Sequence, residues 1–568
     1  LLPEPTTDRG TTRDSRPDDL TRGRPSMATY GIDLGTTYSC IAHVDDTGRP
    51  VIAKNAIGQE TTPSAVYFET PDNVVVGQDA KGSAKLFPDQ VVQLIKRQMG
   101  QQFELEFHGT SHTPESISAL VLRELARAAA EETGEEVRDV VITVPAYFGV
   151  AEREATRNAG EIAGLNVLNL IPEPVAAALH YETLSAEGSA TILVYDLGGG
   201  TFDTTVIRLE GDDVRVVCTD GDHRLGGADW DDRIADHLLE SFLSENPDSS
   251  AAESEDFLQE LAIAAEDLKK GLSSAVSRRY NMRFDGGTAR VELTREAFEG
   301  MTEDLLGRTF EITRRTIDAA AERGVDRFDD VLLVGGSSRM PAVAAGLRER
   351  FGFEPKLHDP DLAVAKGAAR FALIEAVKVR LPGEGEGAEP VSPAEAEQAV
   401  QDAADQLGLE PEKVRMLAGR RVSTVVPRAF GVKTVSFADD GGEVFAVSHV
   451  LRANTVLPAA PEAERFATAY EDQTAIEVEI WEQAGAVESA EPADNAKIGE
   501  GIITDLPRLR KGSPIDISFA MDELGTLRVH AVELQTGKDL HIEVRIQGLD
   551  ESQVDLAKRA VARYAVSE

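Results

Sequence analysis

Residues 30–44 read YGIDLGTTYSCIAHV, and a related stretch at residues 195–206 reads YDLGGGTFDTTV. In the first stretch, apolar and polar residues alternate on both sides of a Gly-Thr-Thr turn. This period of two predicts two strands joined by a tight connection. In the second, a strand-like run leads to Asp196 and three consecutive glycines. A strand-ending aspartate beside a glycine turn therefore occurs twice, which favours duplicated halves that face each other across a cleft.

The residue types in these turns indicate a site for a phosphate and a divalent cation. Glycines leave backbone N–H groups uncovered, and consecutive N–H groups in a turn form a cradle for an anion. An aspartate repels phosphate, so the sensible partner of Asp33 and Asp196 is a cation. Mg2+ fits this position because it usually keeps its waters when it binds beside phosphates. One such turn alone would more often be an unrelated glycine hairpin.

A third glycine segment strengthens the prediction of a nucleotide site. Residues 331–341 read VLLVGGSSRMP, a buried type of strand that ends in bare glycines. A flat ring such as a nucleoside can approach the backbone there, because no side chain intervenes. The sequence contains no G-x-x-x-x-G-K-[ST] pattern, so the predicted site is not a P-loop.

The composition predicts a multidomain globular protein whose main partner is neither nucleic acid nor a membrane. The 568 residues are too many for one core and predict two to four domains. The 99 acidic and 58 basic residues give a net charge of −41, which opposes binding to a polyanion. The two cysteines form no metal or disulfide pattern, no apolar run is long enough for a bilayer, and a cytoplasmic location is expected. Residues 1–27 have little to bury and are expected to be a disordered leader.

Longer motifs resemble one branch of the ATPase fold that actin, sugar kinases and the seventy-kilodalton heat-shock chaperones share. The stretches that look like the heat-shock (DnaK-type) branch are DVVITVPAYFGVAEREATRNAGEIAGL (139–165), IPEPVAAALHY (171–181), GDHRLGGADWDDRI (221–234), AAEDLKKGLSS (264–274) and DPDLAVAKGAA (359–369). The resemblance implies an actin-like α/β ATPase domain with two duplicated lobes over residues 28–377. It also implies ATP or ADP with Mg2+ as cofactors, and K+ as a further candidate.

The resemblance implies roles for individual residues of this first half. Asp33 and Asp196 would hold the metal, and the implied catalytic residues are Lys96, Glu173, Asp203 and Thr201. Without its matched neighbours in QLIKRQMGQQF (93–103), Lys96 would be interpreted as a solvated surface lysine. The implied nucleotide contacts are Gly35, Thr36, Thr37, Tyr38, Gly198, Gly199, Gly227, Glu266, Lys269, Lys270, Ser273, Gly335, Gly336, Ser337, Arg339 and Asp361.

The second half changes character twice. Residues 378–421 begin as a flexible charged run and predict a linker with one amphipathic helix, capped by Ser392 and closed by Gly408. Residues 422–548 change to a period of two and predict an all-β unit. This unit resembles the peptide-binding sandwich of the same family. Residues 549–568 predict one amphipathic helix, a stub of the family's multi-helix lid, with Val554, Ala557, Val561 and Tyr564 on one face.

The resemblance implies that the sandwich binds unfolded or extended hydrophobic peptides through backbone hydrogen bonds and one apolar pocket. The implied pocket residues are Val432, Val435, Phe466, Ala469, Ile476 and Val478. The same alternation could simply form the core of the sandwich. Pro145 and Arg153 would form a switch between the nucleotide state and the sandwich.

The candidate partners also include a J-domain co-chaperone and a nucleotide-exchange factor. The family arginine implicated in J-domain contact is Asn169 here. The stretch RRVSTVVPRAFG (420–431) replaces the family linker, which docks onto the ATPase domain and carries the coupling signal.

Three functions compete for this sequence. The first is an ATP-dependent chaperone that slowly hydrolyses ATP and binds exposed hydrophobic peptide segments. The second is a non-hydrolysing, nucleotide-dependent binding or regulatory relative, which the retained Lys96, Glu173 and Asp203 oppose. The third is a sugar kinase, which the all-β unit and the IPEPVAAALHY stretch oppose.

Overall fold

The structure is a computed structural model, and it describes most of the chain. The described residues are 29–567, apart from residue 46, residues 183–188, residue 212, residues 383–391, residues 439–440, residue 486, residue 524, residues 545–548 and residue 550. The expected disordered leader, residues 1–27, lies outside them. Within the described part of the chain, no helix combines the length and the apolar character needed to cross a bilayer.

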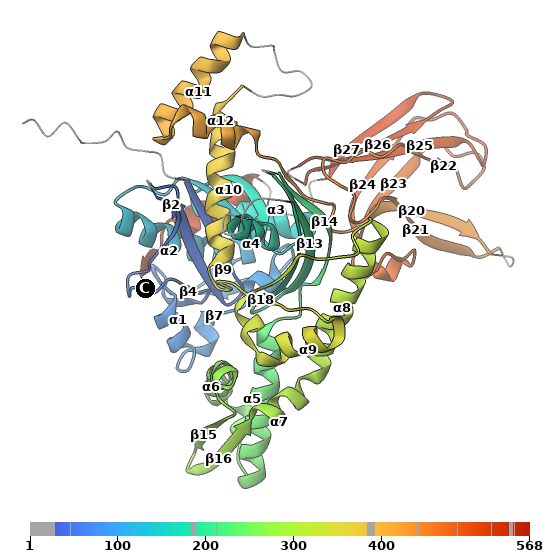
Figure 1. The fold of residues 1–568 in the computed structure, drawn as a ribbon. Coiled ribbons are helices and arrows are strands. Elements are labelled where there is room, and N and C mark those ends of the chain that lie inside the picture. Colours follow the sequence, from blue (N-terminus) through green and yellow to red (C-terminus); the bar gives the residue numbers. More distant parts are fainter. Residues whose placement is uncertain are drawn as a thin grey trace, which may run out of the picture.

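Two mixed sheets with the same central pattern organise the N-terminal unit, residues 29–382 (Figure 1). The first sheet contains β1 (Thr29–Asp33), β2 (Tyr38–Val44), β3 (Pro50–Ala53), β4 (Thr62–Pro63), β10 (Asp139–Val144) and β11 (Asn166–Pro172). The second contains β12 (Ala190–Leu197), β13 (Phe202–Glu210), β14 (Asp213–Asp222), β17 (Asp330–Val334) and β18 (Lys356–Leu357), and β19 (Val422–Ser423) joins its edge from the segment that follows the unit. In each sheet a central strand pairs antiparallel with the next strand and parallel with a later one, so β1–β2–β10 matches β12–β13–β17.

Helices cover the faces of these sheets, which explains why β1 and β12 are almost wholly buried. The helices that pack on them are α2 (Pro114–Thr133), α3 (Val150–Ile162), α4 (Glu173–Glu182), α8 (Glu303–Glu322) and α10 (Ala363–Arg380). The unit also contains α1 (Gln78–Ser83), α5 (Gly227–Glu245), α6 (Glu255–Ser274), α7 (Arg295–Met301) and α9 (Pro341–Phe351). Their ends follow local rules: α2 begins with Thr113 as its cap and Pro114 in its first turn, and ends at the left-handed Gly134.

Short strands and turns complete the N-terminal unit. They are β5 (Val66–Thr70), β6 (Asn73–Val76), β7 (Val91–Val92), β8 (Leu105–Phe107), β9 (Thr110–His112), β15 (Ser277–Phe284), β16 (Gly287–Thr294) and the 3-10 turns η1 (Pro88–Gln90), η2 (Ile95–Gln98), η3 (Ala251–Glu253) and η4 (Gly336–Arg339). Strands β5, β6 and β7 form a small sheet beside α1.

The segment after α10 contains two helices, so the prediction of a single helix is wrong. The first, α11 (Pro393–Leu407), has the expected capping box at Ser392 and the left-handed end at Gly408. The second, α12 (Pro411–Gly419), starts with a proline in its first turn, which is a usual helix-start signal. Both helices pack on the end of α10 through an apolar cluster that includes Val377 and Val414.

Residues 430–544 form a sandwich of two four-stranded antiparallel sheets, called the sandwich below (Figure 1). One sheet contains β20 (Phe430–Phe437), β21 (Glu443–Leu451), β23 (Ile476–Gln483) and β24 (Asn495–Ile503), which follows the short turn η5 (Pro492–Asp494). The other contains β22 (Glu464–Ala467), β25 (Pro514–Met521), β26 (Leu527–Glu533) and β27 (Lys538–Val544). The inner faces share one core, with Ile480 from the first sheet and Phe519 from the second both fully buried.

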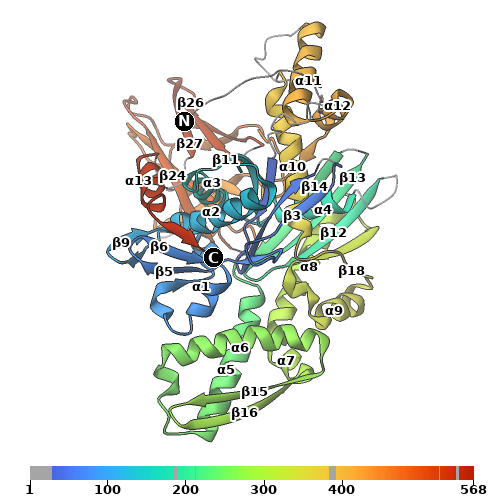
Figure 2. The same ribbon diagram turned by 90° about the vertical axis from the view of Figure 1, so that its left-hand side faces the viewer.

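The last described residues return to the N-terminal unit instead of covering the sandwich (Figure 2). Helix α13 (Glu551–Val561) packs against α2 and α3, and β28 (Ala565–Ser567) pairs in parallel with β6. The side chain of Tyr564 is buried among Phe68 and His112, and its hydroxyl shares a 3.0 Å hydrogen bond with Nε2 of His112.

The prediction of one helix through residues 549–568 is therefore wrong in extent, since the helix ends at Val561 and a strand follows. Three members of the predicted apolar face lie on α13, whereas Tyr564 follows its end. All four members, Val554, Ala557, Val561 and Tyr564, join the core of the N-terminal unit.

Candidate nucleotide site and contact between the units

The two glycine turns identified in the sequence meet face to face. A Cβ atom built on Gly199 would lie 2.1 Å from Oγ1 of Thr37, and one on Gly200 would lie 2.3 Å from Cγ2 of Thr36. Only residues without a side chain allow the two turns to approach so closely. The strand-ending residues Asp33 and Asp196 consequently open onto one cleft.

This cleft has a volume of about 1000 Å³, which is ample for a nucleotide. It is lined by all the residues for which a metal, nucleotide or catalytic role was predicted, except Asp203 and Gly227. Asp203 lies fully buried behind the cleft wall, and the Gly227 carbonyl accepts a 2.6 Å hydrogen bond from Nζ of Lys269. The structure thus brings three distant segments of the sequence together around one cavity.

Lys96 lies in η2 and points into the cleft. Its Nζ donates a 2.7 Å hydrogen bond to Oε1 of Glu173, and only 4% of the residue is exposed. The ammonium group also lies 5.7 Å from the centroid of the Phe148 ring. The alternative interpretation of Lys96 as a solvated surface residue is therefore wrong.

Four carboxylates surround this single lysine: Asp33, Glu173, Asp196 and Asp203. Burial raises the pKa of Asp203 to about 7, and the negative charge of Glu173 adds to the effect. Burial and Glu173 also raise the pKa of both Asp33 and Asp196. The floor of the cleft carries more negative charge than Lys96 can compensate. Carboxylate oxygens are the ligands that Mg2+ prefers, so this donor set fits the implied metal.

A second charged cluster joins the two sides of the cleft. Glu266 on α6 accepts a 3.1 Å hydrogen bond from the Tyr38 hydroxyl, pairs with Nζ of Lys270 at 2.7 Å, and also pairs with Lys81 on α1. Burial alone would raise the pKa of Glu266, but Lys81 and Lys270 lower it to about 2. Sequence reasoning missed Lys81, because only the fold brings α1 next to α6.

Lys269 on the same helix is fixed by another residue that the sequence reasoning missed. Its Nζ donates a 2.6 Å hydrogen bond to Oδ2 of Asp231 on α5. Burial raises the pKa of Asp231 to about 6, while the lysine acts in the opposite direction. On the facing wall, Nε of Arg339 lies 3.2 Å from Oδ2 of Asp361, so these two predicted residues form a pair.

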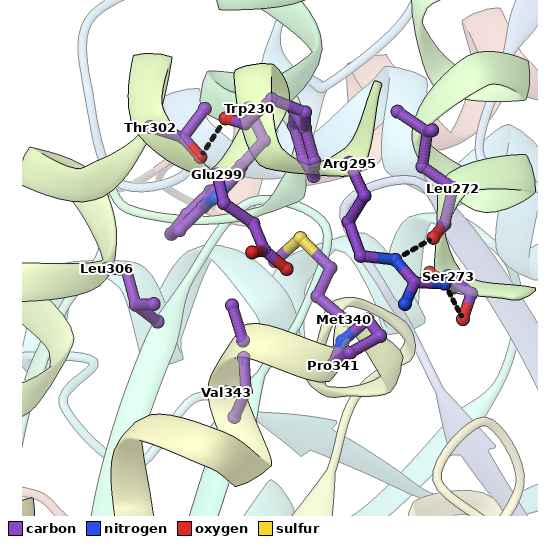
Figure 3. A pocket seen from close by; sticks show the side chains of 12 residues that line it. Trp230, Leu272, Ser273, Arg295, Glu299, Thr302, Leu306, Met340, Pro341 and Val343 are labelled. Carbon is purple, nitrogen blue, oxygen red and sulfur yellow. Dashed lines mark hydrogen bonds between the residues drawn. The ribbon is translucent and has the colours of Figure 1, made fainter. Parts of the chain in front are cut away.

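A much smaller apolar cavity, of about 20 Å³, lies behind α6 (Figure 3). The Arg295 side chain beside it donates to the carbonyls of Leu272 at 2.8 Å and Ala275 at 3.0 Å. These carbonyls lie at the C-terminal end of α6, where a helix leaves acceptors unpaired. The cavity holds about one water molecule at most, and we assign its lining a structural role in fixing α6.

A buried ion cluster joins α3 to the sandwich. Nη2 of Arg428 lies 3.1 Å from Oε1 of Glu152, and its Nη1 lies 3.9 Å from Oε2 of Glu482. The guanidinium also lies over the Tyr147 ring, with Cζ 4.9 Å from the centroid. A Cβ atom on Gly149 would lie only 2.4 Å from Oε1 of Glu482, so a side chain here would displace the carboxylate from its present position.

The same loop of the N-terminal unit touches both this cluster and Asp203. The backbone N–H groups of Ala146 and Tyr147 donate to the Asp203 carboxylate at 3.2 and 3.1 Å. The Tyr147 hydroxyl donates at 3.2 Å to the carbonyl of Gly485 in the sandwich. The predicted switch residues flank this loop: Pro145 precedes it, and Nε of Arg153 donates at 3.0 Å to the carbonyl of Phe148.

The chain between the units also contacts the N-terminal unit. Strand β19 pairs in parallel with β14, with Val422 opposite Val214 and Ser423 opposite Arg215. The basic linker therefore docks on the edge of the second sheet, as the resemblance implied for the family linker.

The six predicted peptide-site residues divide into two groups. Val432, Ile476 and Val478 lie in the sandwich core, whereas Val435, Phe466 and Ala469 are half-buried. Two neighbours that the sequence reasoning missed form an exposed aromatic pair: the rings of Phe437 and Tyr470 have centroids 5.8 Å apart, and each residue is 41% exposed. No sequence signal marks this pair, since β20 and the loop after β22 meet only in the fold.

Comparison with known families agrees with this architecture. The family model described as Hsp70 protein matches residues 29–107, 103–380 and 424–568, which include both units. The chain therefore belongs to the Hsp70 family. Members of this family are chaperones that generally use ATP or ADP with Mg2+ and bind unfolded peptides and co-chaperones.

Proposed function

We propose that this chain is an ATP-dependent chaperone that hydrolyses ATP slowly and binds exposed hydrophobic peptide segments of unfolded proteins. One observation carries the proposal: a buried Lys96–Glu173 pair lies among excess carboxylates at the floor of a nucleotide-sized cleft. A site that only binds nucleotide does not need a desolvated lysine at this position, whereas phosphoryl transfer needs a positioned cation there.

The residues of the cleft have distinct roles in the proposed reaction. Asp33 and Asp196 would hold Mg2+, which supplies positive charge to the phosphate oxygens when it is bound. Lys96 stabilises the charge on the transferred phosphoryl group and orients the attacking water, and Glu173 holds the lysine in place. Asp203 lies behind the cleft wall, where its carboxylate accepts hydrogen bonds from the backbone of Ala146 and Tyr147, and it would help to order the water shell of the metal from there.

The sandwich is proposed to hold an extended peptide beside β20 and β22. Phe466 and Val435 offer half-buried apolar surface there, and the exposed rings of Phe437 and Tyr470 extend it. Aromatic rings exposed next to an apolar core are typical of surfaces that bind other chains. In this structure α13 and β28 lie on the N-terminal unit, so they leave that side of the sandwich uncovered.

The contact between the units is proposed to couple the two activities. Tyr147 connects Asp203 to Gly485 through its backbone N–H and its hydroxyl, and Arg428 holds its ring. A shift of the sandwich would thus move groups that hold the Asp203 carboxylate. Peptide binding and nucleotide state would then influence each other.

A single-turnover hydrolysis assay with Mg-ATP, with and without an unfolded peptide, tests the proposal. We expect slow conversion of bound ATP to ADP and phosphate, at a rate that the peptide changes. Tight ATP binding without any hydrolysis would instead support the non-hydrolysing alternative. Hydrolysis at the same rate with and without peptide would retain the ATPase and remove the coupling.

A further inference from the structure

Two histidines and an aspartate converge on the outer face of the sandwich, remote from the nucleotide cleft. His530 on β26 and His541 on β27 are directly opposite each other in the antiparallel register. Asp539 is two residues before His541, so its side chain lies on the same face of the strand. The ligand atoms of all three residues lie within 4.8 Å of one another.

The geometry of this triad matches the donor arrangement around a transition-metal ion. Nε2 of His530 and Nε2 of His541 lie 3.1 and 3.0 Å from the same oxygen, Oδ2 of Asp539. Metal–ligand bonds of about 2.0–2.1 Å in a tetrahedron would set neighbouring donor atoms about 3.3–3.4 Å apart. The spacing of the donor atoms therefore suits an ion, which would bind after rotation of the exposed imidazole rings.

The charge state of the triad also suits a cation. The Asp539 side chain is 48% exposed, and an exposed aspartate is ionised at neutral pH, so its carboxylate is available to a cation. The two imidazole rings are stacked, with centroids 4.0 Å apart and planes 7° apart, and Nε2 of each lies close to Oδ2 of Asp539, so at least one exposed ring would rotate to aim both nitrogens at one ion. A bound cation would take the place of the hydrogen bonds between the two nitrogens and this oxygen, and each coordinating Nε2 would be unprotonated. The nearby Arg528 is partly neutralised by Glu543, 3.8 Å away.

We propose that His530, Asp539 and His541 form a binding site for a divalent transition metal of the Zn2+ type. Two imidazole nitrogens and one carboxylate oxygen are a donor set that suits Zn2+, Cu2+ and Ni2+ better than Mg2+. Three protein ligands leave a further position for water, because the side chains are 39%, 48% and 73% exposed for His530, Asp539 and His541. The site is separate from the proposed ATPase activity and does not depend on it.

The proposed site would act as a clamp on the edge of the sandwich. Strand β27 is the last strand of its sheet and pairs only with β26 within that sheet. An ion held by both strands would bind the folded sandwich and not the unfolded chain, and would therefore stabilise the fold.

Isothermal titration of the full chain with ZnCl2 in excess MgCl2 tests the proposal, since Mg2+ fills the hard-cation positions of the cleft. We expect one equivalent of Zn2+ to bind. The affinity should fall at least about tenfold in His530→Ala, His541→Ala and Asp539→Asn, since even loss of an outer-shell partner typically costs roughly 10–100-fold. His237→Ala, which alters a histidine on α5 outside the triad, should bind like the wild type.

Thermal unfolding provides the second readout. Zn2+ should raise the unfolding temperature of the wild type and of His237→Ala, but not that of the triad variants. The substituted side chains lie on the outer face, so these variants should fold, and unchanged Mg-ATP binding would verify this. No micromolar Zn2+ binding by the wild type, or binding that is unchanged in all three triad variants, would overturn the proposal. The two cysteines cannot supply an alternative accessible site, since both are buried.

Discussion

Two buried charge clusters in this molecule differ in their balance. At the floor of the cleft, four carboxylates surround Lys96. At the contact between the units, Glu152 and Glu482 meet the guanidinium of Arg428, with Arg153 close by.

The charge balance of each buried cluster indicates what the cluster binds. Unpaired buried charge is very unfavourable, so an acidic excess indicates that a cation is still to be bound. A balanced cluster needs no further ion. Here it fixes the position of one structural unit relative to the other. The first cluster is therefore expected to respond to metal and nucleotide, and the second to the relative position of the units.

Removing Lys96, which the four carboxylates surround, should have the largest effect. We predict that Lys96→Ala slows the chemical step of ATP hydrolysis at least about 100-fold, equivalent to about 2.7 kcal/mol of transition-state stabilisation, while ATP affinity changes only a few-fold. Single-turnover kinetics measure the step. Lys54→Ala is the matched control, since Lys54 is an exposed lysine on the rim of the same cleft. Equal rates in the wild type and Lys96→Ala would remove Lys96 from the mechanism.

Reducing the acidic excess should weaken metal binding. In Asp196→Asn, one proposed metal ligand loses its charge, and we predict that the Mg2+ concentration needed for tight ATP binding rises at least about tenfold. Fluorescent-nucleotide titrations at a series of Mg2+ concentrations measure this shift. Glu60→Gln, on the exposed rim of the cleft, should leave the Mg2+ dependence unchanged. An Mg2+ dependence identical to that of the wild type would show that Asp196 is not a ligand.

Breaking the balanced cluster should separate the units without affecting the intrinsic chemistry. Arg428→Met keeps the apolar stem but leaves Glu152 and Glu482 without their shared cation. We predict that peptide no longer alters the hydrolysis rate, while the peptide-free rate stays within about threefold of the wild type. Arg452→Met, which removes an exposed ion pair with Glu488, is the control. Full peptide stimulation in Arg428→Met would contradict the role of this cluster.

The smallest effect concerns the protonation of Glu482. Burial raises its pKa in the docked units, although Arg428 acts in the opposite direction. An acid whose pKa is higher in the docked form than in the unfolded chain stabilises the docked form at low pH. This contribution is lost as the pH rises through the pKa of the docked form. Glu482→Gln imitates the protonated acid, so thermal stability should match the wild type near pH 5 and exceed it at pH 8. An unfolding-temperature difference that does not vary with pH would show that Glu482 stays ionised.

Sequence patterns predicted the cleft well because its elements carry local signals. At Asp33 and Asp196, a strand with a period of two ends in glycines. Such glycines are expected where two backbone segments approach closely. The capping box at Ser392 predicted α11 for the same reason. The turns and the capping box each depend on residues that are close together in the sequence, so a single sequence is enough to predict them.

Other features depended on segments that are distant in the chain, and the sequence did not reveal them. Lys81 reaches Glu266 only because α1 and α6 face each other, and Arg428 reaches Glu152 only when the sandwich is docked. Strand β28 has only three residues, and its partner β6 lies far earlier in the chain. Tyr564 fitted a helical face by spacing, yet its contact with His112 lies past the end of α13.

The balanced cluster is proposed to couple the acid-rich cleft to the sandwich. The affinity of a labelled, extended hydrophobic peptide for the chain saturated with ATP or with ADP measures this coupling. Lys96→Ala is the suitable background, since ATP should persist during the titration. We predict weaker peptide binding with ATP than with ADP, and a weakening of ATP relative to ADP by the same factor when peptide is present. Equal peptide affinities in the two nucleotide states would contradict the account, because they would show two independent units on one chain.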